Sequence, residues 1–143
     1  MNHAPTAVRP KTYLNVLLIL GVTHLLNDLI QSLIPAVYPI LRDKYQLDFI
    51  QIGVITLTFQ IAGSLLQPVV GAVTDRRPFP YSTVIGMLFT LSGLIGLAFA
   101  PTYNLILVSA ASIGIGSSIF HPEATRMARY ASGGRQGLAQ GIF

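Results

Sequence analysis

Cysteine and tryptophan are both absent from this chain of 143 residues, and it has only five acidic side chains. Without cysteine, the chain has neither a disulfide framework nor a thiolate metal site. Without tryptophan, tyrosine and phenylalanine must supply the aromatic side chains that lie at a membrane surface. Charged residues make up 10% and hydrophobic residues 52% of the chain, which is too apolar a composition for an ordinary soluble domain of this size.

The basic residues and the histidines are spread along the sequence. The formal net charge is +4, but the lysines and arginines sit between apolar segments and form no basic run. We therefore expect no nucleic-acid partner. The three histidines show no clustering in the sequence and no metal-ligand spacing. From the sequence we expect no metal site, no catalytic site and no enzyme activity.

One long segment carries no charge at all. Residues 49–74 are uncharged, and the run ends at Asp75-Arg76-Arg77. About 24 helical residues, at about 1.5 Å each, reach roughly 36 Å and cross a hydrocarbon core of about 30 Å. Lipid offers the backbone no hydrogen-bond partners, so such a segment must be helical. The predicted fold class is an all-α membrane protein, a bundle of transmembrane helices.

Comparable apolar segments and the breakers between them divide the chain. The breakers are Pro39 through Asp48, Arg77 through Pro80, Pro101-Thr102 and Ser132 through Arg135. The resulting segments are a tail at 1–12, four transmembrane helices at about 13–38, 50–73, 82–100 and 103–125, and the start of a fifth helix at 137–143.

Lysine and arginine are distributed unevenly between the two sides of these helices. The tail, the loop after the second span and the segment after the fourth span carry most of them: Arg9, Lys11, Arg76, Arg77, Arg126, Arg129 and Arg135. The opposite side carries Arg42 and Lys44. The positive-inside rule then predicts that the N-terminus and the tail are cytoplasmic.

The third span carries a stripe of small residues, Ser82, Gly86, Thr90 and Gly93. Spacings of four, four and three place them on one helical face, where another helix can approach closely. We interpret this stripe as a packing seam and assign it no substrate role. The same interpretation applies to the small residues of the fourth span, Gly114, Gly116, Ser117 and Ser118.

The first span carries polar residues on one helical face: His24, Asn27, Asp28 and Gln31. Asp28 lies at membrane depth, where a charged carboxylate costs on the order of 3 kcal/mol. One interpretation is a titratable group that faces a water-filled cavity and carries protons. The alternative is a structural hydrogen bond to a neighbouring helix, with His24 as a local partner. Acids inside membranes are generally functional, which favours the first interpretation.

The fourth span ends in His121-Pro122-Glu123. Proline removes a backbone donor, so we expect a kink there, beside a histidine and a carboxylate that could face a ligand. The alternative is an interfacial helix end, where Glu123 pairs with Arg126 at i,i+3. The sequence leaves both interpretations open. His121 and Glu123 join the first-span residues as candidates for proton or substrate contact.

The segment Gly71-Ala-Val-Thr-Asp75-Arg76 resembles the signature of the major facilitator superfamily, Gly-x-x-x-Asp-Arg/Lys. The resemblance implies that Gly71, Asp75 and Arg76 form a cytoplasmic gating motif. Residues 78–80 are Pro-Phe-Pro, where glycine and basic residues are usual, so the downstream contacts of the signature are not carried over.

Four segments, 24–41, 51–60, 65–78 and 119–143, are similar to bacterial fosmidomycin-resistance proteins within that superfamily. This resemblance implies the N-terminal fragment of a twelve-helix, proton-coupled drug antiporter of the inner membrane, with its site between two halves. Its partners would be the lipid bilayer, protons, a small-molecule drug and the missing C-terminal part of the same transporter. The proton gradient would be its energy source, without a cofactor.

Two other functions remain open at this point. A self-contained four-helix transporter of the small multidrug-resistance type would use one acid in its first helix, as Asp28 could provide. A non-transporting membrane subunit or a membrane enzyme is the other alternative. His121 and Glu123 are a titratable pair close in sequence, but no nucleophile motif accompanies them.

Overall fold

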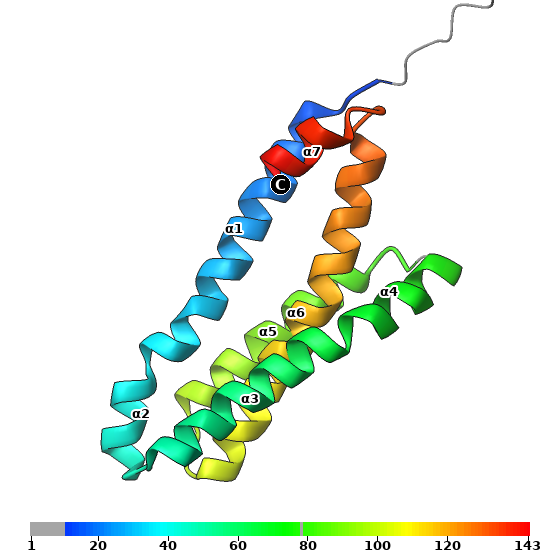
Figure 1. The fold of residues 1–143 in the computed structure, drawn as a ribbon. Helices are drawn as coiled ribbons and strands as arrows, with labels where there is room; N and C mark the ends of the chain where they lie inside the picture. The colour runs from blue at the N-terminus through cyan, green and yellow to red at the C-terminus, as the bar shows by residue number, and fades with distance from the viewer. Residues whose placement is uncertain (1–10, 78) are drawn as a thin grey trace, which may run out of the picture.

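A computed structural model describes residues 11–77 and 79–143, which fold into α-helices joined by short connections (Figure 1). The expected tail at 1–12 lies almost wholly outside the described residues, as do Arg9 and Pro78. The helices of the described residues are α1 (Leu14–Ala36), α2 (Tyr38–Tyr45), α3 (Phe49–Leu65), α4 (Gln67–Arg76), α5 (Ser82–Ala98), α6 (Tyr103–Ala131) and α7 (Gln136–Ile142).

Three stretches of the described chain are long and apolar enough to cross a membrane, namely Leu14–Tyr45, Phe49–Arg76 and Tyr103–Ala131. The remaining apolar helix, α5, has 17 residues and is at the short end of the spanning range. Large hydrophobic side chains are exposed along α1, α3 and α5, as expected of helices that face lipid. The structure therefore confirms the predicted all-α transmembrane bundle.

The first two spans each consist of two helices that meet before a proline. Pro39 lies in the first turn of α2, where its missing N–H is not needed, so the chain continues as a helix to Tyr45. The prediction of a break from Pro39 through Asp48 is therefore wrong for residues 39–45, which are helical. The helix ends at Gln46, which adopts the left-handed conformation with φ of 53°. Pro68 has the same position in the first turn of α4.

The long helix α6 is the centre of the bundle, and it packs against α1, α3, α4, α5 and α7. The buried residues of α5 are the four small residues of the predicted stripe, Ser82, Gly86, Thr90 and Gly93. A Cβ atom on Gly116 of α6 would lie 2.2 Å from Thr90 Oγ1 and 2.5 Å from the Gly86 carbonyl oxygen. The predicted packing seam is thus the contact between α5 and α6.

Two apolar clusters lie at the two ends of the bundle. Leu41, Ile55 and Ile106 join α2, α3 and α6. Figure 1 shows α2 at the lower end of the bundle. Leu17 and Ala128 join α1 to α6 at the other end, together with Ala139 of α7. Figure 1 shows α7 lying against the first half of α1. These end contacts fix α1 beside α6 and so determine which of their polar residues face each other.

Candidate functional site

Helices α1 and α6 bring together three titratable side chains that are far apart in the sequence. Asp28 Oδ2 lies 3.5 Å from His24 Nε2 on the same helix, and Asp28 Oδ1 lies 3.8 Å from His121 Nε2 on α6. One ligand atom of each residue lies within 4.8 Å of the others. Two histidines that are far apart in the sequence therefore lie together in the fold, because α6 carries His121 past the polar face of α1.

Gln31 and Ser117 extend this cluster along the same face. Ser117 Oγ donates a hydrogen bond of 3.1 Å to Gln31 Oε1, and Gln31 Nε2 lies 3.4 Å from His121 Nε2. The sequence assigned Ser117 to helix packing alone. The available signal was its spacing, because Ser117 lies four residues before His121 and shares its helical face.

His24 is held in place from its other side by the residue that follows α7. Its Nδ1 lies 2.7 Å from the carbonyl oxygen of Phe143, and the two rings stack with centroids 4.2 Å apart. Beside them, α1 and α7 border a cavity of about 480 Å³, and His24 and Asp28 form part of its wall. The Asp28 side chain is 54% exposed, so its carboxylate faces open space rather than a packed helix.

Asn27, the fourth candidate on α1, is fully buried. Its Nδ2 lies 3.4 Å from Asp28 Oδ1, whereas its Oδ1 has no hydrogen-bond partner among the described residues. Asn27 therefore touches the cluster from the packed side of α1, and it does not share the exposure of Asp28.

Glu123 belongs to a different site from His121, although the two are neighbours on α6. Its side chain is 4% exposed, and Glu123 Oε2 accepts a hydrogen bond of 2.5 Å from Arg126 Nη2. Arg126 also donates to the carbonyl of Thr74 and lies 3.9 Å from the Asp75 carboxylate. Of the two interpretations of this segment, the structure shows the i,i+3 pair, and α6 continues as one helix through Pro122.

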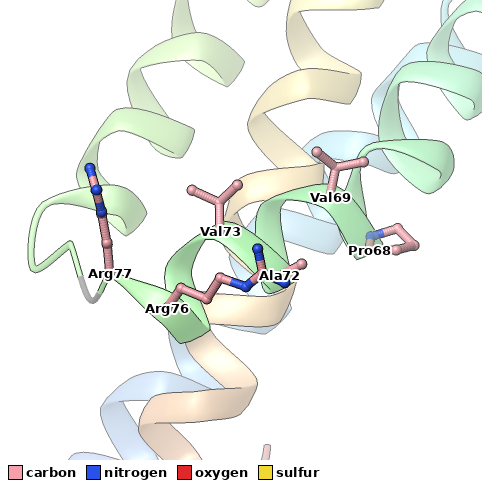
Figure 2. A pocket seen from close by; sticks show the side chains of 6 residues that line it. All are labelled: Pro68, Val69, Ala72, Val73, Arg76 and Arg77. Carbon is pink, nitrogen blue, oxygen red and sulfur yellow. The ribbon is translucent and has the colours of Figure 1, made fainter.

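The three residues of the signature motif point to two sides of α4. Gly71 and Asp75 face α6 and line a cavity of about 260 Å³ together with Pro122 and Arg126. Figure 2 shows Arg76 on another side of the helix, beside an open pocket of about 600 Å³. The other residues that line this pocket are Pro68, Val69, Ala72, Val73 and Arg77.

A sequence profile described as Major Facilitator Superfamily matches residues 20–143. The chain belongs to the major facilitator superfamily. This confirms the resemblance read from the signature residues, and it places the chain in a family of membrane transporters rather than enzymes. No solved structure gives a significant match.

Individual relatives agree with the family assignment. The chain is 56% identical over 140 residues to the Fosmidomycin resistance protein of Escherichia coli (strain K12), an alignment that covers 98% of this chain and 34% of that protein. It is 47% identical over 128 residues to the Uncharacterized MFS-type transporter YfnC of Bacillus subtilis (strain 168), covering 90% of this chain and 31% of the relative. The chain thus spans about a third of the length of these relatives.

A more distant relative, the Uncharacterized MFS-type transporter YwoD of Bacillus subtilis (strain 168), is 26% identical over 119 residues. That alignment covers 83% of this chain and 26% of the relative.

Proposed function

We propose that this chain is the N-terminal part of a proton-coupled efflux transporter of the bacterial inner membrane, which exports a drug such as fosmidomycin. Family membership and the name of the Escherichia coli relative, Fosmidomycin resistance protein, support this proposal. The chain matches about a third of the length of these relatives, which supports a further, C-terminal part that would complete the transporter. The uneven distribution of lysine and arginine supports a cytoplasmic N-terminus.

The observation that carries the proposal is the position of Asp28. Its carboxylate lies among two imidazole rings and faces a cavity, at the depth where an unneeded charge would be costly. In the proposed mechanism Asp28 takes up and releases the proton. His24 and His121 form its immediate surroundings, while Gln31 and Ser117 position His121 and contact the substrate.

The second part of the proposal concerns the gate on the cytoplasmic side. Arg126 joins the buried Glu123 of α6 to Thr74 and Asp75 of α4. Separation of the ends of α4 and α6 would require these contacts to break. We assign the gating role to this cluster together with Gly71 and Arg76 of the signature motif.

The test compares Asp28→Asn with Asp43→Asn in the complete transporter expressed in a drug-sensitive bacterium. Asp43 lies on the exposed surface of α2, so its amide variant removes one carboxylate without altering the proposed site. We expect Asp28→Asn to abolish fosmidomycin resistance while the amount of protein in the membrane stays unchanged. Wild-type resistance in Asp28→Asn would overturn the proposal.

A further inference from the structure

We propose that His24, Asp28 and His121 form a binding site for a divalent transition-metal cation, with Zn²⁺ as the best fit. His24 Nε2 lies 3.5 Å from Asp28 Oδ2, and His121 Nε2 lies 3.8 Å from Asp28 Oδ1. One ligand atom of each residue lies within 4.8 Å of the others. In a tetrahedral site with bonds of about 2.0 to 2.1 Å, neighbouring ligand atoms lie about 3.4 Å apart. The contacts of 3.5 and 3.8 Å are close to this spacing, so the three side chains are placed to converge on one cation.

The orientation of the His24 ring supports the same conclusion. A backbone carbonyl can only accept a hydrogen bond, so the contact of 2.7 Å with Phe143 assigns the proton to Nδ1. In this tautomer the lone pair of Nε2 faces the Asp28 carboxylate, as it would in a metal ligand. Histidine metal ligands usually donate their other N–H to a carbonyl or carboxylate in this way.

The identity of the ligands selects the class of metal. Imidazole nitrogen suits zinc and its first-row neighbours, whereas magnesium and calcium prefer an all-oxygen site. Gln31 Nε2 lies 3.4 Å from His121 Nε2, which makes their hydrogen bond long and weak. A cation that binds the lone pair of His121 Nε2 therefore replaces only a weak contact. Three protein ligands leave at least one coordination position for water or an anionic group. His24 and Asp28 also line the cavity beside α7, which would give a cation access to them.

The test measures Zn²⁺ binding to the purified chain by isothermal titration calorimetry, with an affinity tag that contains no histidine. We expect one equivalent of Zn²⁺ to bind. His24→Ala, His121→Ala and Asp28→Asn should each weaken binding by about 100-fold or more, since loss of an outer partner alone costs about 10- to 100-fold. The matched controls are His3→Ala in the tail and Asp43→Asn on α2, which should bind as the wild type does.

A second measurement does not depend on whether the variants fold. Co²⁺ bound to the wild-type chain should show the strong visible absorption of a four- or five-coordinate site and lose it on addition of Zn²⁺. The spectrum of hexaaqua Co²⁺, no saturable Zn²⁺ binding, or an equal loss in His3→Ala would overturn the inference. Asp28 belongs to both proposed sites, so Zn²⁺ and a proton would compete for its carboxylate. The two proposals still fail separately, because export without zinc binding contradicts only this site, and zinc binding without export contradicts only the proposed function.

Discussion

Arg126 provides a quantitative test of how the α4 and α6 ends are held together. Glu123 has 4% of its side chain exposed, and its charge partner Arg126 has 18% exposed. Removal of one partner from a buried ion pair costs about 3–5 kcal/mol, because the other charge is left uncompensated. Arg126→Met keeps an unbranched side chain of similar length but removes the guanidinium. We expect it to lower the free energy of unfolding by about 3–5 kcal/mol.

The double variant separates the charge effect from the loss of packing. In Arg126→Met with Glu123→Gln, no buried charge remains, so we expect at least about 2 kcal/mol of the loss to be recovered. Asp75→Asn is the matched control, because its carboxylate is 76% exposed and lies 3.9 Å from Arg126. Exposed pairs contribute about 1 kcal/mol or less. Unfolding by sodium dodecyl sulfate in mixed micelles, followed by far-ultraviolet circular dichroism, measures the stability of the wild type and of these three variants. Equal stability of the single and double variants would refute the reasoning.

Three further predictions concern the gate, the helix seam and the chain alone. Asp75→Ala should make single cysteines introduced on the cytoplasmic side more reactive, and the chain has no native cysteine to interfere; lost drug binding with unchanged reactivity would contradict this. Gly116→Ala should destabilise the bundle by about 1–3 kcal/mol, because its Cβ would meet Thr90 and the Gly86 carbonyl. The control is Gly53→Ala, whose Cβ would meet nothing within 4 Å, and it should be neutral or stabilise the bundle by up to about 1 kcal/mol. Equal changes in stability in Gly116→Ala and Gly53→Ala would refute the packing seam. Residues 1–143 expressed alone should insert but confer no resistance, whereas co-expression with the remaining part of the transporter should restore it; resistance from the chain alone would revive the four-helix alternative.

The parts of the fold that follow from regular spacing could be predicted from the sequence. Ser82, Gly86, Thr90 and Gly93 recur at helical intervals, and all four are buried against α6. The helix α2 could not be predicted in this way, because a proline can end a helix or, like Pro39, lie in the first turn of the next one. Sequence alone does not show on which side of a proline a helix begins.

The candidate site was predictable on each helix separately. The i,i+4 spacing of His24 and Asp28 gave one half of the cluster, and the i,i+3 spacing of Glu123 and Arg126 gave the other ion pair. The position of His121 beside Asp28 depends on the rotation and depth of α6 relative to α1. Those are set by contacts along the whole bundle, so no local pattern in the sequence reveals them.

The most direct test of the role of Asp28 uses the complete transporter in proteoliposomes, with two measurements on the same preparation. One follows drug accumulation driven by an imposed proton gradient, and the other follows exchange of labelled for unlabelled drug without a gradient. Asp28→Asn should lose the gradient-driven accumulation and retain the exchange, because the site still binds drug but no longer couples it to a proton. Gradient-driven accumulation at the wild-type rate in Asp28→Asn would contradict the proposed coupling.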